Sequence, residues 1–225
     1  MKKEEIETLD SLYIRDCGIM PYAPALALQH DLVEQRRKGE IGDTVLVLEH
    51  EPVITLGARQ TANKLLAARD ELVARGIEVV DIRRGGGVTA HNPGQLVLYP
   101  ILHLQDARLG VNEYIRTLEQ IGIELLQRLA VTAARNKGFP GLWVENRKIA
   151  SIGVRVSKFV TYHGLAININ NDLSIFDHFV PCGLDGVQMT SVLIETGVEY
   201  DMTDVKRQLS QLLFEHLSFG KEAAK

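Results

Sequence analysis

The sequence predicts a single α/β (α+β) domain in which helices pack on a mixed β-sheet. Strand-like apolar runs joined by tight polar turns are mixed with segments of helical spacing long enough to cross between strands. The 225 residues are 45% hydrophobic and 24% charged, so they can bury a core without metals or disulfides. Because neither an internal repeat nor a Pro/Ser-rich linker divides the chain, we expect residues 1–225 to form one catalytic domain, whose strand order the sequence does not give.

The N-terminal part of the chain is predicted to form three strands and a helix. Residues 11–16 have the pattern of a strand, and Ala25–Lys38 that of an amphipathic helix, which Gly39 is placed to end. The apolar run Thr44–Leu48 is typical of a buried strand, and a second short strand, Val53–Leu56, follows after a proline.

The middle of the chain alternates between the two periodicities. Leu65–Arg75 has helical spacing, with a glycine beyond its end, and Ile77–Ile82 is a β-branched strand. Gln95–Tyr99 is predicted to be a strand, and Val111–Leu129 a longer helix.

The last third is predicted to hold three successive strands and a helix. Gly141–Val144, Lys148–Val156 and Val160–Ile169 have strand composition and are joined by short polar turns. Thr203 opens a final helix that we expect to reach Leu217.

Composition argues against several classes of partner. The formal net charge is −4 and no basic stripe is present, so nucleic acid and anionic membranes are poor partners. No apolar run approaches the ~20 residues that a membrane span requires, and we expect a cytoplasmic protein. Its two cysteines, Cys17 and Cys182, are then expected to remain thiols.

A glycine-rich segment, Arg84–His91, is the first feature that could carry chemistry. Consecutive glycines let a ligand touch the backbone, and exposed N–H groups there can bind a phosphate or a carbonyl oxygen. A dinucleotide fingerprint would need a helix directly afterwards, but Pro93 and Gly94 form a turn into the strand at Gln95, and no Gly-Lys-Ser/Thr follows. Taken alone, the segment is equally explained as a hairpin bend in which His91 satisfies a turn.

Small residues recur inside two predicted strands. Ser151-Ile152-Gly153 and His163-Gly164-Leu165-Ala166 each place a glycine where it loses packing, which indicates close approach by another group. Together with the glycine-rich segment, these sites predict a bound, elongated ligand.

Cys182 is the candidate nucleophile. It lies in a turn, Pro181-Cys182-Gly183, whereas Cys17 lies near Leu12 and Ile14 in a predicted apolar strand, the usual place of a structural cysteine. A thiol of pKa about 8.5 is mostly protonated at neutral pH, so a cation must favour the thiolate. Lys148, at the start of an apolar strand, is a candidate, but a solvated hairpin explains a lysine there equally, and spacing does not place it near Cys182.

The sequence lacks the motifs of two other chemistries, a zinc site and a serine nucleophile. His50, His91, His163 and Cys182 lack the local spacing of zinc ligands, which argues against metal binding. No Gly-x-Ser-x-Gly nucleophile elbow is present. The histidines are better interpreted as positioning or acid/base groups around the glycine-rich segment.

The motifs together resemble one family, the lipoyl(octanoyl) transferases, or octanoyl-acyl-carrier-protein:protein N-octanoyltransferases, of lipoate biosynthesis. The resemblance is strongest over residues 48–190. It is carried, in order, by Glu49-His50-Glu51-Pro52-Val53-Ile54-Thr55-Leu56-Gly57, Arg84-Gly85-Gly86-Gly87-Val88-Thr89-Ala90-His91, Pro93-Gly94-Gln95, Glu145-Asn146-Arg147-Lys148-Ile149, Ser151-Ile152-Gly153, His163-Gly164-Leu165-Ala166 and Pro181-Cys182-Gly183.

The resemblance implies a biotin/lipoate protein ligase-like fold and a set of site residues. Cys182 matches the acyl-thioester nucleophile of the family, and Lys148 matches the lysine that lowers the pKa of that cysteine. The residues implied to bind substrate are Arg84, Gly85, Gly86, Gly87, Val88, Thr89, Ala90, His91, Ser151, Ile152, Gly153, Gly164, Leu165 and Ala166, and no cofactor or metal is implied. Ala90 stands where the family usually has an aromatic residue and Asn92 where glycine is common, which bears on pocket width or chain-length preference.

The implied reaction has two steps. Cys182 attacks the thioester of octanoyl-acyl-carrier protein, the donor, and backbone N–H groups stabilise the oxyanion. A lysine of a lipoyl domain, in a 2-oxoacid dehydrogenase or the glycine cleavage H protein, then takes the acyl group, with Lys148 alternating as base and acid.

Two alternatives are kept. A lipoate–protein ligase of the same fold makes an acyl-adenylate from ATP and needs no cysteine at position 182. A non-catalytic module that holds an acylated carrier would not need Cys182 and Lys148.

Overall fold

The structure is a computed structural model that describes residues 12–180 and 186–218. Among these residues the chain folds into an eight-stranded mixed sheet, ordered β1-β2-β6-β10-β9-β8-β7 with β11 paired to β9, and a three-stranded sheet, β4-β3-β5. The strands of the larger sheet are β1 (Tyr13–Met20), β2 (Thr44–His50), β6 (Gln95–Ile101), β7 (Ala134–Asn136), β8 (Phe139–Val144), β9 (Arg147–Ser157), β10 (Val160–Asn168) and β11 (Gln188–Met189). Those of the smaller sheet are β3 (Val53–Leu56), β4 (Glu78–Asp81) and β5 (Thr89–His91).

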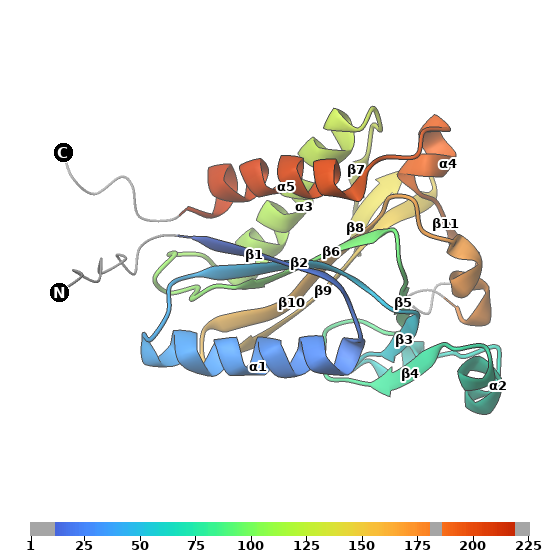
Figure 1. Cartoon of the computed structure of the whole chain (residues 1–225), viewed down its shortest axis with the longest axis horizontal. Coiled ribbons are helices and arrows are strands. Elements are labelled where there is room, and N and C mark those ends of the chain that lie inside the picture. The colour runs from blue at the N-terminus through green and yellow to red at the C-terminus, as the bar shows by residue number, and fades with distance from the viewer. Residues whose placement is uncertain (1–11, 181–185, 219–225) are drawn as a thin grey trace.

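Helices cover both faces of the larger sheet. In Figure 1, α1 lies along one face, and α3 and α5 lie against the other. The helices are α1 (Tyr22–Lys38), α2 (Arg69–Ala74), α3 (Val111–Arg128), α4 (Val192–Thr196) and α5 (Met202–Leu217), with 3₁₀ turns η1 (Gln60–Ala62) and η2 (Leu173–His178). Within the described ranges, no helix is both long and apolar enough to cross a membrane.

The apolar run of β2 is explained by this two-sided cover. Its side chains alternate between the two cores: Val45 and Val47 pack with α3 and α5, whereas Leu46 and Leu48 pack with Ala25 of α1. Because both faces are buried, every position of the strand can be apolar.

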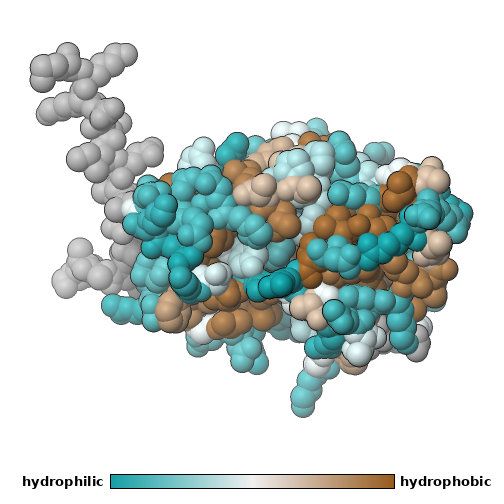
Figure 2. Space-filling model, turned by 90° about the horizontal axis from the view of Figure 1, so that it is seen from below, coloured by the Kyte–Doolittle hydropathy of each residue, from teal (hydrophilic) through white to brown (hydrophobic). Residues whose placement is uncertain are grey.

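The smaller sheet has a core of its own. Ile54 of β3 and Ala90 of β5 pack with Phe176 and Phe179, which follow β10 in the chain. Figure 2 views this side of the molecule and shows hydrophobic side chains gathered on the half where the smaller sheet and α2 lie, where Leu66 is exposed.

The single mixed α/β domain predicted from the sequence is confirmed, and several predicted boundaries differ; β1, for example, spans Tyr13–Met20 where residues 11–16 were predicted. Helix α1 begins at Tyr22, three residues early, because Pro24 is compatible with a first helical turn. Helix α2 is shorter than predicted, since Leu65 instead forms a bridge with Phe179. Strand β5 was not predicted, and it pairs antiparallel with β3.

Strand β1 forms an edge of the larger sheet and is irregular. Its parallel register with β2 shifts between Asp16 and Ile19. Gly18 has φ of 63°, and its N–H donates to Asp16 Oδ1 at 2.9 Å. The edge strand is therefore bent at its middle by a bulge.

Candidate functional site

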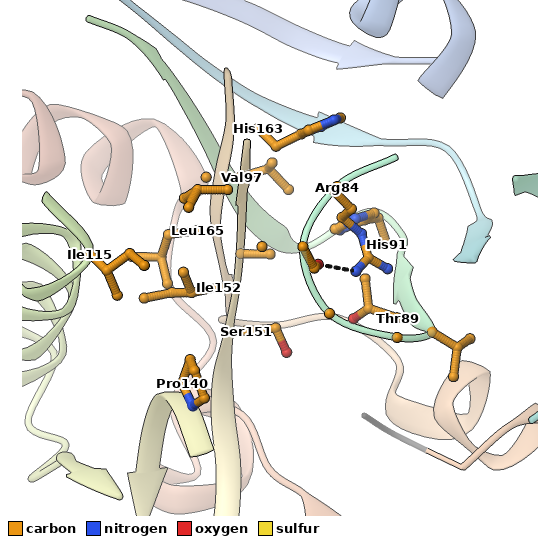
Figure 3. A pocket seen from close by; sticks show the side chains of 18 of the residues that line it. Arg84, Thr89, His91, Val97, Ile115, Pro140, Ser151, Ile152, His163 and Leu165 are labelled. Carbon is orange, nitrogen blue, oxygen red and sulfur yellow. Dashed lines mark hydrogen bonds between the residues drawn. The ribbon is translucent and has the colours of Figure 1, made fainter. Parts of the chain in front are cut away.

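A cavity of about 340 Å³ lies between the glycine-rich segment, strands β6, β9 and β10 and the β7–β8 hairpin. Figure 3 shows Ile115, Leu165 and Ile152 on one side of it and Arg84, His91 and Thr89 on the other. One side is therefore apolar and the other polar, and the volume is within the usual range of small-molecule sites.

Most residues expected to bind substrate line this cavity. They are Arg84–Thr89, His91, Ser151–Gly153 and Gly164–Ala166. Strands β9 and β10 bring the second and third groups together, because Gly153 pairs with Gly164 in their antiparallel register. Segments about 80 residues apart in sequence thus share one surface.

Ala90 is the exception. In β5, Thr89 and His91 line the cavity, while Ala90 between them is fully buried in the second core. Alternation along a strand sends neighbouring side chains to opposite faces. Asn92 does not line the cavity either, because its Nδ2 donates to the Asp172 carbonyl at 2.8 Å. Ala90 and Asn92, the two residues that depart from the family pattern, therefore do not line the cavity.

The close approach expected at Gly153 and Gly164 is present, and the approaching atoms belong to the chain itself. A Cβ at Gly153 would lie 3.0 Å from the Gly85 carbonyl oxygen, and one at Gly164 would lie 2.3 Å from the Leu98 carbonyl oxygen. The Gly85 N–H donates to the Val154 carbonyl at 3.2 Å. The glycine-rich segment is thus docked directly onto β9.

Arg84 holds the glycine-rich segment in place. Its side chain is buried, and its guanidinium donates to the Thr55 carbonyl at 2.9 Å and to Thr55 Oγ1 at 2.8 Å. It also donates to the Gly85 carbonyl at 3.0 Å, the dashed line in Figure 3. The segment is further joined to the chain after β3, since Arg59 N–H donates to the Gly86 carbonyl at 3.1 Å.

Lys148 lies in β9 and lines the same cavity. It is only 3% exposed, so the alternative of a solvated hairpin lysine is wrong. Its Nζ lies 5.5 Å from the centroid of the Trp143 ring, within the range of a cation–π contact. A Cβ at Gly141 would lie 2.9 Å from Lys148 Cε, so the absence of a side chain there leaves room for the lysine.

Cys182 and its neighbours Pro181 and Gly183 lie outside the described residues. The described chain on the C-terminal side runs into β11, where Met189 pairs with Lys148 and the Thr190 N–H donates to the Lys148 carbonyl at 2.9 Å. Cys17 lies in β1, half-buried beside the core under α1, and burial raises the pKa of its thiol. Cys17 is therefore poorly suited to act as a nucleophile at neutral pH.

Two histidines near the cavity are locked by hydrogen bonds, and a third is strained. His50 Nδ1 lies 3.0 Å from the Met20 carbonyl oxygen and its Nε2 lies 2.8 Å from the Tyr99 hydroxyl, while His91 Nδ1 lies 2.7 Å from Gln95 Oε1. His163 lines the cavity with φ of 55°, an uncommon conformation for a non-glycine residue.

All three imidazoles are kept neutral. Burial lowers the pKa of His50 to about 4 and that of His163 to about 3, with the Arg84 charge adding to the effect at His163. Burial, then the neighbouring His50, lowers the pKa of His91 well below its ordinary value. These rings can donate or accept hydrogen bonds but do not carry charge at neutral pH.

The sequence did not reveal several residues of the cavity wall. Tyr22 of α1, Tyr99 of β6 and Ile115 of α3 reach it from positions outside the motifs. Tyr22 stacks on His91, with ring centroids 6.2 Å apart. Only the three-dimensional packing brings these side chains to the glycine-rich segment, so the sequence motifs did not point to them.

The described residues hold one grouping that could share a metal ion. It consists of Glu124, Glu215 and His216, on helices α3 and α5, and none of the three lines the cavity. His50, His91 and His163 are not in a grouping of that kind.

Comparison with known proteins gives the class. The model of the lipoyl protein ligase A/B catalytic domain matches residues 21–214. The chain belongs to this family.

Individual relatives narrow the class to an activity. An octanoyltransferase of Desulfotalea psychrophila is 41% identical over 89% of this chain and 92% of its own length, and one of Chloroflexus aurantiacus is 43% identical over 88% and 91%. This enzyme is accordingly an acyltransferase.

Solved structures agree on the fold. A lipoate protein ligase of Thermoplasma acidophilum, described with its E2 lipoyl domain, is 17% identical with a TM-score of 0.70, covering 95% of this chain and 86% of that one. The apo biotin protein ligase of Aquifex aeolicus is 15% identical with a TM-score of 0.54, covering 95% and 72%. The biotin/lipoate protein ligase-like fold is thereby confirmed.

Proposed function

We propose that this enzyme transfers an octanoyl group from octanoyl-acyl-carrier protein to a lysine of a lipoyl domain, in the cytoplasm, through a thioester on Cys182. The observation that carries the proposal is the buried side chain of Lys148 in the wall of a cavity that is apolar on one side. A lysine beside a thiol favours the thiolate, and in the sequence Cys182 lies shortly before β11, the strand that pairs with Lys148.

The cavity suits an acyl substrate. Val97, Ile115, Ile152 and Leu165 offer an apolar wall for the aliphatic chain. Backbone N–H groups of the glycine-rich segment are the candidates for holding the thioester carbonyl oxygen.

In the first step, the Cys182 thiolate attacks the carbonyl carbon of the donor thioester. A new C–S bond forms, the old C–S bond breaks, and the carrier leaves as a thiol after taking one proton, which Lys148 supplies. The products are the acyl-enzyme and the free carrier.

In the second step, the acceptor lysine attacks as an unprotonated amine. A C–N bond forms, the C–S bond to Cys182 breaks, and the proton lost by the attacking nitrogen passes through Lys148 to the departing thiolate. The acyl group becomes an amide and Cys182 is regenerated. A thioester donor is already activated, so no nucleotide takes part.

The decisive experiment offers two donors to one preparation. With octanoyl-acyl-carrier protein and a lipoyl domain but no nucleotide, we expect the domain lysine to be octanoylated, while free octanoate with ATP and Mg²⁺ gives little product. Before the acceptor is added, intact mass spectrometry should show a hydroxylamine-sensitive octanoyl adduct on Cys182. ATP-dependent acylation with Cys182 unmodified would instead assign the chain to the ligase activity.

Two cysteine variants complete the test. Cys182→Ala should abolish transfer in a folded protein, because the reaction has no other nucleophile. Cys17→Ser should leave transfer within about twofold, since Cys17 lies in β1, away from the cavity wall. Near-normal turnover in Cys182→Ala, or strong loss in Cys17→Ser, would show that the wrong thiol was chosen.

A further inference from the structure

His91 faces the cavity with one ring nitrogen engaged. Its Nδ1 lies 2.7 Å from Gln95 Oε1, and its ring is 6% exposed and stacks on Tyr22. Which nitrogen carries the proton depends on whether Gln95 turns its oxygen or its nitrogen toward the ring.

A chain of buried amides decides the orientation of Gln95. Asn168 lies 2.9 Å from the Thr190 carbonyl oxygen, which can only accept, so Asn168 presents Nδ2 there. Its Oδ1 therefore faces Gln95, which must offer Nε2, at 2.8 Å. The same Nε2 lies 3.3 Å from a second obligatory acceptor, the Ala90 carbonyl oxygen. Gln95 Oε1 is thus turned to His91, and Nδ1 of His91 must carry the proton.

A second anchor fixes the same orientation independently. Asn92 Nδ2 donates to the Asp172 carbonyl at 2.8 Å, so Asn92 Oδ1 accepts from Asn171 Nδ2 at 3.1 Å. Asn171 Nδ2 also approaches Asn168 Oδ1 at 3.3 Å. Two backbone carbonyls at separate places therefore require the same orientation of Asn168.

The other nitrogen of His91 is a bare acceptor. With the proton on Nδ1 and the ring neutral, Nε2 carries a lone pair. Within the described ranges no group donates to Nε2, and Nε2 is not among the buried polar atoms that lack both a partner and solvent access. It is therefore open to the cavity that His91 lines.

A neutral acceptor calls for a ligand group that donates. The reacting end of an acyl thioester has a carbonyl oxygen and methylene groups and no N–H, whereas the attacking amine has N–H bonds. We propose that His91 Nε2 accepts a hydrogen bond from the amine of the acceptor lysine, and that Gln95, Asn168 and Thr190 are positioning residues that fix the required tautomer. This inference rests on the proposed function.

The amide chain also joins the two sides of the site. Thr190 accepts from Asn168 through its carbonyl and donates to the Lys148 carbonyl through its N–H, at 2.9 Å each. Hydrogen bonds thereby connect both His91, through Gln95 and Asn168, and Lys148 to the buried residue Thr190. A hydrogen-bonded amine at His91 would be held in fixed relation to the strand that carries Lys148.

Nitrogen-15 NMR of the histidine rings tests the tautomer directly. We expect His91 to carry its proton on Nδ1, the less common tautomer of a free histidine, and to keep it as the pH falls through the range in which exposed histidines titrate. The His91→Phe variant assigns the signal by its loss. Gln95→Met removes the acceptor at nearly the same side-chain volume, and the ring should then move its proton to Nε2. Gln35→Met, at an exposed pair with Asp31, is the matched control and should leave the His91 signal unchanged.

Half-reaction kinetics test the amine contact. His91→Phe and Gln95→Met should slow the transfer from octanoylated enzyme to a lipoyl domain by roughly ten- to a hundredfold, while octanoylation of Cys182 by the donor stays within about threefold. Gln35→Met should change neither rate.

The outcomes separate this inference from the proposed function. A His91 ring protonated on Nε2 in the parent enzyme overturns the tautomer assignment, and an equal loss in both half-reactions overturns the contact with the amine. If the parent forms no octanoyl adduct on Cys182, the proposed function and the amine contact fall together, while the NMR result still decides the tautomer. Should Gln95→Met not fold, the parent enzyme and His91→Phe still decide both points, the tautomer by NMR and the amine contact by the two half-reactions.

Discussion

At the scale of single residues, Lys148 is the side chain whose environment most restricts its role. Its Nζ lies 5.5 Å from the centroid of the Trp143 ring, and the residue is only 3% exposed to solvent. A buried lysine in a cavity wall is a candidate functional residue, because enzymes use lysines in such places as proton donors and acceptors.

The first prediction concerns the thiol that Lys148 is proposed to serve. In a Cys17→Ser background, Lys148→Ala should raise the pH at which iodoacetamide alkylates Cys182, because removing a nearby ammonium disfavours the thiolate. Lys148→Arg should not restore transfer, since a guanidinium stays protonated and cannot act as a base. Lys38→Ala, at the exposed end of α1, serves as the control. An unchanged alkylation profile in Lys148→Ala would mean that the lysine does not lie beside Cys182.

The second prediction concerns Gly141, the glycine that makes room for this lysine. It has φ of 118°, and a Cβ there would lie 2.3 Å from the Ala150 carbonyl oxygen. Gly141→Ala should lower the free energy of unfolding by about 3 kcal/mol and reduce turnover as Lys148 is displaced.

Gly138→Ala is the matched comparison in the same hairpin. Gly138 also has positive φ, but a Cβ there would meet nothing within 4 Å. It should cost about 1 kcal/mol, from backbone strain alone. Urea unfolding measures both, and equal losses would show that crowding at Gly141 has no effect.

Many residues that line the cavity could be predicted from the sequence. The positions that were misinterpreted have physical explanations. Resemblance and motif found Lys148 and the residues around the glycines. Ala90 was included because it lies within a continuous motif, yet alternation in β5 turns it to the second core. Gly153 and Gly164 signalled a close approach correctly, but only coordinates show that the approaching atoms are backbone oxygens of this chain.

At the scale of elements, the glycine-rich segment is stabilised by the strand it packs on. Arg84 reaches back to Thr55 of β3, and Gly85 bonds to Val154 of β9, so the segment joins the two sheets. Its conformation therefore depends on one buried guanidinium.

The third prediction tests that dependence. Arg84→Lys keeps the charge and loses the planar fork, so it should leave Thr55 partly unsatisfied and loosen the segment. Hydrogen exchange at the Ala58 and Arg59 amides, which donate to the Arg84 and Gly86 carbonyls, should speed up roughly tenfold or more. Amides of α5 should exchange as before, and unchanged exchange at Ala58 and Arg59 would show that other contacts hold the segment.

Elements were predictable where the sequence pattern was local. The Val53–Leu56 strand matches the prediction, and α1 ends at Gly39 with φ of 73°, as expected. Strand β5 was missed because three residues carry no readable period and its pairing with β3 is not local. Strand order required the same non-local information.

At the scale of the whole molecule, the neutral histidines make stability depend on pH. His50, His91 and His163 have lowered pKa values in the folded state, while in the unfolded chain they protonate near pH 6.5. Their contribution to the free energy of unfolding is complete above about pH 6.5. It declines as the pH falls below this value, because only the unfolded state then takes up protons.

The fourth prediction follows from this linkage. Between about pH 6.5 and pH 5, each of the three histidines should remove up to about 1.4 kcal/mol of unfolding free energy per pH unit. His163→Asn is chosen because asparagine tolerates positive φ. It should reduce the slope of unfolding free energy against pH by the amount that corresponds to about one bound proton. Urea unfolding at several pH values measures the slopes, and an identical slope in His163→Asn would show that this ring titrates normally.

The bulge in β1 has a consequence for association between molecules. An edge strand presents unpaired backbone groups that a second sheet could extend, and Tyr13 and Ile19 are exposed along this one. The kink at Gly18 interrupts the regular spacing that such pairing needs, and Asp16 is held there by its bond to the Gly18 amide. Straightening the strand, for example with Gly18→Val, would convert an edge that discourages self-assembly into a template for it.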